Sequence, residues 1–231
     1  MAHYNLTEPI VFREDLVNVL VVENRKLLSE MVMELISQAG GGEGGFVLSN
    51  EGSEMSISRC MDVVMNPFSP RVNERDILNH LHMRMKEDSL GEDMYLSLNA
   101  LLTDISRNVQ QLMDRQSVQL ECNDINVASL LKSMNVRFSV PDTVLERVCD
   151  HVDILSEYRG TEIFVFINLK SFIGAEDLRD LYSHIMYRKK NILLIESHLS
   201  ERMDCESVRV IDEDLCEISL SNDDIIYRDL V

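Results

Sequence analysis

The residues best placed to do chemistry follow the first apolar stretch of the chain. Residues 17–22 lead through the turn Glu23-Asn24-Arg25-Lys26 into a helical pattern. A strand that runs into a helix in this way is where nucleotide-binding proteins carry a glycine-rich phosphate loop. Because this turn has no glycine and no Lys-Ser or Lys-Thr pair follows it, its backbone amides cannot enclose a triphosphate. The sequence therefore argues against nucleotide hydrolysis.

Arg25 and Lys26 fall in the first turn of the expected helix. The helix dipole disfavours cations at this end by up to about 1 kcal/mol, so we expect a partner that compensates them. That partner is either a phosphate or a carboxylate from elsewhere in the fold or from another subunit. The alternative is two solvated cations beside Glu23 and Glu30, since exposed ion pairs contribute little.

Three further cationic or ionisable side chains share one face of a second expected helix. Arg75, His82 and Lys86 fall within this face if the helix is continuous. Such a face could contact phosphates. The alternative is an exposed surface in which the cations pair with Glu87 or Asp88.

Glu121 and Asp124 are the candidate metal ligands, three residues apart at an expected strand-to-helix junction. A calcium ion takes six to eight oxygen ligands, so backbone carbonyls, water or a neighbouring subunit would have to complete the site. An equally open alternative is that Asp124 caps a helix beginning at Ile125. A second acidic run, Asp212-Glu213-Asp214, fits a solvated turn and is the next candidate for calcium.

The sequence contains no catalytic constellation. HExxH and GxSxG motifs are absent, and no serine or cysteine stands beside a recognisable base, so we expect a protein that is not an enzyme. The five cysteines are odd in number and form no CxxC pair, which fits reduced core residues. No apolar run approaches the roughly 20 residues needed to span a bilayer, and we expect a cytoplasmic protein.

The net charge of −18 is unevenly distributed along the chain. Between Pro67 and Pro141 there are 8 basic and 10 acidic residues, whereas the remainder carries 14 basic and 30 acidic ones. Phosphate binding depends largely on Lys and Arg, which displace counterions. A polyanion would therefore have to meet a segregated basic surface, or one completed by cations or by symmetry-related copies.

The elements that must position these residues alternate between apolar strands and amphipathic helices, as in parallel βαβ units. We expect helices after the first strand as far as Gly40, from 125 to 134, from Thr143, and from 175 to 187. Between Glu74 and Met113 we expect two antiparallel helices separated at residues 89–91. The expected strands are residues 17–22, 46–48, 55–58, 61–65, 117–122, 136–140, 163–167, 192–195, 208–211 and 216–220.

This order predicts an α/β fold made from both ends of the chain. Residues 1–66 form its first part, and residues 142–231 supply a return helix and its second part. Residues 67–141 form a mostly helical insertion between them.

Four motifs follow one another in an order that is similar to a known family. They are "VENRKLL" after the first strand, then "EIFVFINLKSFIGAEDL", "NILLIES" and "VRVIDEDLCEI", with the helical insertion between the first and the second. The chain resembles the CRISPR-associated spacer-acquisition proteins of type II-A systems, the Csn2 family. The resemblance covers most of the chain and is strongest from Leu120 to Glu217.

The resemblance implies a degenerate P-loop-ATPase-like head with an inserted, mostly α-helical leg. It also implies a non-catalytic homotetrameric ring that binds double-stranded DNA, preferring ends, and acts with the CRISPR integrase proteins and the effector nuclease. Structural calcium is implied at acidic sites, for which Glu121 and Asp124 are the candidates, and no nucleotide is expected. For DNA we expect contributions from Arg25, Lys26, Arg75 and Lys86. The alternatives are a degenerate nucleotide-binding regulator and a structural adaptor that recruits other adaptation proteins.

Overall fold

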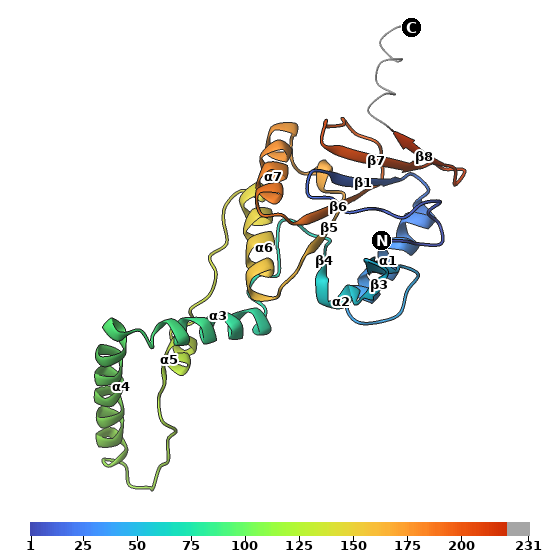
Figure 1. Ribbon diagram of the computed structural model, residues 1–231. Coiled ribbons are helices and arrows are strands. Elements are labelled where there is room, and N and C mark those ends of the chain that lie inside the picture. The colour runs from blue at the N-terminus through green and yellow to red at the C-terminus, as the bar shows by residue number, and fades with distance from the viewer. Residues whose placement is uncertain (221–231) are drawn as a thin grey trace. The chain divides into compact units, whose positions relative to one another are not determined.

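The computed structural model describes residues 1–220, apart from the side chains at positions 92 and 93. The chain divides into two compact units (Figure 1). Unit 1 comprises Met1–Arg71 and the chain from Val140 onward, and unit 2 comprises Val72–Ser139. The sequence places the insertion at residues 67–141. Residues 221–231 of the last expected segment lie outside the described residues.

Unit 1 is built on a six-stranded sheet in the order β4-β5-β6-β1-β7-β8. The first five strands are parallel, and β8 pairs antiparallel with β7 at the edge. Parallel strands are covered on both faces, which explains the near-continuous apolar runs in the sequence. The expected α/β class is therefore confirmed as a mixed fold with a mostly parallel sheet. The strands are β1 Val17–Val22, β4 Met61–Val64, β5 Ile163–Ile167, β6 Asn191–Glu196, β7 Glu206–Ile211 and β8 Glu217–Leu220.

Helices cover both faces of this sheet. The chain leaves β1 through α1 (Arg25–Ala39) and reaches the edge strand β4, then returns through α6 (Val144–Tyr158) to β5 and through α7 (Ala175–Tyr187) to β6. Because parallel crossovers are right-handed, the outward and return connections lie on opposite faces. Helices α6 and α7 pack together on one side of the sheet, and α1 lies on the other (Figure 1).

A short hairpin follows α1 and differs from the sequence prediction. Strands β2 (Leu48–Asn50) and β3 (Ser53–Met55) pair antiparallel, and α2 (Ile57–Cys60) leads into β4. The turn residues Glu51 and Gly52 both have positive φ, at 49° and 80°. Two such residues form the tight turn that fits the twist of a two-stranded hairpin. The strands expected at 46–48 and 55–58 were therefore wrong in position, because this turn sets the register.

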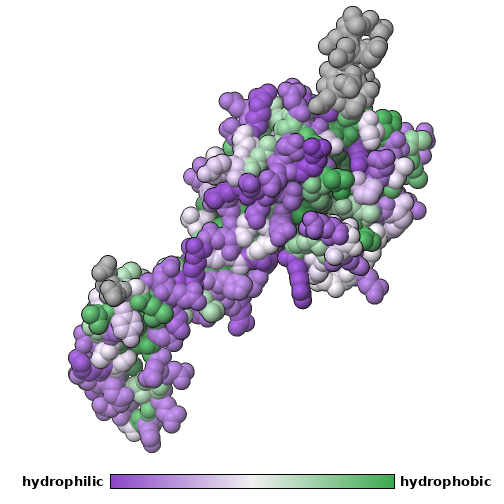
Figure 2. All heavy atoms as spheres, in the orientation of Figure 1, coloured by the Kyte–Doolittle hydropathy of each residue, from purple (hydrophilic) through white to green (hydrophobic). Residues whose placement is uncertain are grey.

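Unit 2 is helical, with α3 (Arg75–Asp88), α4 (Glu92–Met113), α5 (Val127–Ser133) and extended connections. The expected break at residues 89–91 is confirmed. The expected antiparallel packing is wrong, because α3 packs against α5 and α4 turns away from α3 (Figure 1). Apolar side chains remain at the surface in the region that α4 occupies (Figure 2).

The strands expected at 117–122 and 136–140 do not form in unit 2 as the structure describes it. Neither segment has a partner strand among the described residues, so their alternating pattern alone does not create a sheet. The backbone of residues 136–138 instead lies beside α3. Asn73 exchanges two hydrogen bonds with the backbone of Phe138, at 3.0 and 2.9 Å, and His82 Nε2 lies 2.8 Å from the carbonyl oxygen of Val136.

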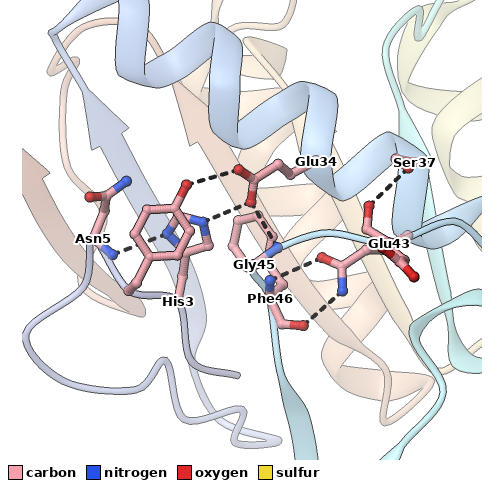
Figure 3. A network of polar contacts seen from close by, with 9 residues as sticks. His3, Asn5, Glu34, Ser37, Glu43, Gly45 and Phe46 are labelled. Atoms are coloured by element: carbon pink, nitrogen blue, oxygen red, sulfur yellow. Dashed lines mark hydrogen bonds and ion pairs between the residues drawn. The ribbon is translucent and has the colours of Figure 1, made fainter.

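Polar contacts attach the first residues of the chain and the loop after α1 to the helix (Figure 3). Glu34 accepts hydrogen bonds from the Tyr4 hydroxyl and from the Gly45 amide, both at 2.8 Å, and lies 3.2 Å from His3 Nε2. The hydrogen bond from Tyr4, followed by that from Gly45, lowers the pKa of the Glu34 carboxyl. One carboxylate thus joins three segments of unit 1.

The first turn of α6 generates a stability prediction. Thr143 and Glu146 form a capping box, in which Thr143 Oγ1 accepts from the Glu146 amide at 3.2 Å and the Glu146 carboxylate accepts from the Thr143 amide at 3.4 Å. Thr143→Ala is expected to lower the free energy of unfolding of unit 1 by about 1 kcal/mol, measured by urea denaturation. Ser183→Ala, which removes an exposed hydroxyl from the interior of α7, is the control and is expected to leave stability unchanged. An equal loss in both variants would contradict the capping account.

Candidate functional site

The N-terminus of α1 is closed by the protein itself. Strand β1 ends at Val22 and α1 begins at Arg25, so two residues connect them. Asn24 is the N-cap, and its side-chain oxygen accepts a hydrogen bond from the Leu27 amide at 3.0 Å. Its Nδ2 donates to the carbonyl oxygen of Glu213 at 3.0 Å. The helix end that would hold a phosphate is thus capped by Asn24 and tied to the β7–β8 turn.

That turn carries the acidic run Asp212-Glu213-Asp214. Asp212 Oδ1 accepts from the amides of Asp214 at 2.9 Å and Cys216 at 2.8 Å, and Glu213 and Asp214 are exposed. The Asp212 side chain therefore organises the turn by accepting from two of its backbone amides, as aspartate commonly does in turns. The turn also places acidic residues beside the positive end of α1, where the dipole favours them.

The two cations at this helix end are both on the surface. Arg25 is exposed, and Lys26 Nζ lies 3.8 Å from a carboxylate oxygen of Glu30, one helical turn away. The Lys26 side chain is 87 % exposed, so this pair contributes little to stability.

The structure contains a buried polar cluster that the sequence did not indicate. Lys170 Nζ lies 2.8 Å from the Glu206 carboxylate, and the Tyr182 hydroxyl donates to the same carboxylate at 2.6 Å. Glu206 also accepts from the Met203 amide at 3.2 Å, and Lys170 donates to the carbonyl oxygen of Glu201 at 3.1 Å. Burial, followed by the charge of Glu206, raises the pKa of Tyr182. In the sequence, Lys170 follows an apolar run and Glu206 precedes another. Nothing in the sequence shows that these two side chains meet.

Glu196, at the end of β6, is the second buried carboxylate of this region. It is 1 % exposed, and its Oε1 accepts from the Lys170 amide at 3.1 Å. Its Oε2 has no hydrogen-bond partner among the described residues. Burial raises the pKa of Glu196 to about 7, because the charged form loses its hydration. This carboxyl is therefore partly protonated near neutral pH.

The remaining expected sites lie in unit 2. Arg75 begins α3 and Lys86 lies in its last turn, and both side chains are exposed. Glu121 and Asp124 are exposed in the extended segment before α5. The N-cap of α5 is Asn126, whose side chain accepts from the Ser129 amide at 3.0 Å, so the predicted cap at Asp124 is wrong. The helix begins at Val127 because Asn126 is a good cap directly before a run of helix formers.

No group of three or more His, Cys, Asp or Glu side chains that could hold a metal ion occurs within the described part of the chain. Nor does any described helix have the length and apolar character required to cross a membrane.

A family model described as CRISPR-associated protein (Cas_Csn2) matches residues 38–215, which take in the last two residues of α1, all of unit 2 and the parts of unit 1 from residue 38 to the β7–β8 turn. The chain belongs to this family. No curated protein matches the sequence. In this Csn2-family chain the matched region includes Arg75, Lys86, Glu121 and Asp124, whereas Arg25 and Lys26 precede it.

Glu196 generates a prediction about pH. Its pKa is raised in the folded protein from 4.5 to about 7, so folding favours its protonated form. The stabilisation that Glu196 gives to the folded state is fully present below about pH 4.5. The free energy of unfolding then falls, by about 3 kcal/mol at most, as the pH rises through about 7. Glu196→Gln should remove this loss, so the variant should become more stable relative to the parent between pH 5 and pH 8 in urea titrations. Glu54→Gln, at an exposed position, is the control. Parallel pH profiles for the parent and Glu196→Gln would refute the assignment.

Proposed function

We propose that this Csn2-family chain is a non-catalytic, cytoplasmic DNA-binding ring protein that acts in CRISPR adaptation, when new spacers are acquired. Family membership is the observation that carries the proposal. Its ligand is double-stranded DNA, held through phosphates without preference for base sequence, and linear ends allow the ring to thread onto it. Integrase proteins of the CRISPR system and the effector nuclease are its partners.

The geometry at α1 supports a role without nucleotide turnover. We propose that unit 1 is a P-loop-ATPase-like head that has lost its phosphate loop, and that unit 2 is the leg. The two-residue connection before α1 leaves no room for a loop that wraps a triphosphate, and Asn24, which caps the Leu27 amide, is itself held by the carbonyl oxygen of Glu213. These observations favour the DNA-binding role over a nucleotide-binding regulator.

Helix α4 supports assembly into a homotetramer. Its apolar residues recur at alternating intervals of three and four, which is the spacing of a coiled-coil seam. Among them only Leu102 is buried, at 8 % exposed, whereas Leu112 is 58 % exposed. The helix has few charged residues, so a like helix from a second copy is a suitable partner for this seam. Its positions are Tyr95, Leu98, Leu102, Ile105, Val109 and Leu112.

Calcium is proposed as a structural ion of the assembled ring. Glu121 and Asp124 are exposed and three residues apart, and two carboxylates are too few for a calcium site. Backbone carbonyls, water and a neighbouring subunit would supply the remaining oxygens. The ion would relieve repulsion between acidic subunits and so help DNA binding indirectly.

The DNA-binding proposal predicts a steep dependence on salt. If each subunit offers two or three cations, a tetramer neutralises on the order of ten phosphates, and log affinity should fall against log salt with a slope near −9. Linear duplex DNA is titrated with the full chain by gel shift, with covalently closed DNA as the comparison. Accumulation on linear DNA alone is expected from a ring that threads onto ends.

Four results would overturn this proposal. A flat response to salt would exclude phosphate contact as the source of affinity. Strong preference for one base sequence would require a different surface. Stoichiometric binding and hydrolysis of labelled ATP would favour an enzyme, while a chain that binds partner proteins but no duplex would favour an adaptor.

The assembly proposal predicts that a charge in the α4 seam separates the subunits. Ile105→Glu should convert the tetramer to smaller species in light scattering at micromolar concentration, with and without calcium, because it places carboxylates in an apolar interface. Thr103→Glu, on the opposite side of α4, is the control and should retain the tetramer. A monomeric parent chain would defeat the assembly proposal, and a tetrameric Ile105→Glu variant would exclude α4 as the interface.

A further inference from the structure

A returning segment of unit 2 lies along one face of α3. His82 is buried at 5 % exposed, and its Nε2 contacts the Val136 carbonyl oxygen at 2.8 Å. Asn73, just before α3, holds the backbone of Phe138 through both its amide and its carbonyl groups. Side chains alternate along an extended backbone, so Arg137, between these two anchored residues, points away from α3 and is exposed.

This arrangement places Arg137 between two other cations. Arg75 and Lys86 are eleven residues apart, which puts them within about 20° of one another around α3 and about 16 Å apart along it. His82 lies on the same stripe between them, so the segment that it anchors covers the middle of the row. Lys132, exposed in the last turn of α5, lies four residues before Val136.

Among the described residues, none of the four cations is paired with a carboxylate. No described carboxylate lies within 4.0 Å of Arg75, Lys86, Lys132 or Arg137. The carboxylates of α3 itself, Asp76, Glu87 and Asp88, lie about 80° or more around the helix from the stripe. By contrast, several exposed cations elsewhere are held by carboxylates at short range, as in the pairs Arg107–Asp104 at 2.8 Å, Arg188–Asp153 at 2.8 Å and Lys189–Glu14 at 3.5 Å.

We infer that Arg75, Arg137, Lys86 and Lys132 form a phosphate-binding strip on unit 2, and that Asn73 and His82 are positioning residues that set Arg137 in its row. This inference rests on the proposed DNA-binding function and assigns it to one surface. Each strand of a duplex carries one phosphate about every 3.4 Å along the helix axis, so a row of this length can reach several of them. The strip has no recognition helix or aromatic platform, which suits backbone contact independent of base sequence.

Arg137→Gln tests the strip. Affinity of the full chain for a labelled linear duplex is measured by fluorescence anisotropy across about 50 to 200 mM potassium chloride. Near 0.1 M salt, the variant should bind about eightfold more weakly than the parent for each strip that contacts the duplex. The slope of log affinity against log salt should fall in magnitude by about 1 per strip, equally for different sequences. The side chain is exposed, so circular dichroism and thermal unfolding should match those of the parent.

Arg107→Gln is the matched control, because it makes the same charge change at an exposed position of unit 2 whose guanidinium is paired with Asp104. It should leave affinity within about twofold and the slope unchanged. Equal losses in the two variants would show a general effect of net charge and overturn the strip. An unchanged Arg137→Gln variant beside a parent that binds DNA would also overturn it, while leaving the proposed function intact. Failure of the parent chain to bind duplex DNA would refute the proposed function itself.

A second pair of variants tests the positioning role. His82→Ala should release residues 136–138 and reduce both the affinity and the salt slope, as Arg137→Gln does. His82→Gln can still donate to the Val136 carbonyl and should recover the slope. Thermal unfolding separates this effect from a loss of the fold. Equal slopes for the parent and His82→Ala would remove His82 from the account.

Discussion

The buried ion pair between Lys170 and Glu206 is the interaction on which the path of the chain across the sheet depends. The chain must pass from β6 over β1 to reach β7, and it does so through a connection that contains no helix. Backbone groups in such a connection are stabilised by side-chain partners. Glu206 accepts from the Met203 amide, and Lys170 donates to the Glu201 carbonyl oxygen. Loss of either charge would leave the other buried and unpaired, at a cost of about 3 to 5 kcal/mol.

Pairing between opposite charges also matters on the surface. The chain has 40 acidic and 22 basic residues, so a cation without a nearby carboxylate is less expected than a paired one. Where cations support the fold, as Lys170 and Arg188 do, carboxylates hold them at 2.8 Å. Along α3, Arg75 and Lys86 lie on one side of the helix, whereas Asp76, Glu87 and Asp88 lie on other sides, together with Arg84. A strongly acidic protein can in this way present a basic surface without a basic composition.

The sequence predicted the elements that are determined locally. β5 and α7 have the expected bounds, since a short apolar run and a helical stripe each carry their own signal. Residues 117–122 and 136–140 carried the signal of strands, but a strand also needs a partner, and pairing is a long-range property. The residues of the candidate site also divide into those with a local signal in the sequence and those whose contacts depend on the whole fold. Single exposed cations such as Arg75 could be selected from spacing, whereas the contact between Lys170 and Glu206, 36 residues apart, could not.

The closed end of α1 has a consequence for how the protein is controlled. In the proposed role, a helix end with no phosphate loop, capped by Asn24 that is tied to Glu213, would bring no nucleotide whose cleavage could make a step irreversible. Occupancy of DNA would then follow mass action, set by the concentrations of subunits, duplex and salt. In the proposed DNA-binding role, the moment of release would then depend on a partner that competes for the same phosphates.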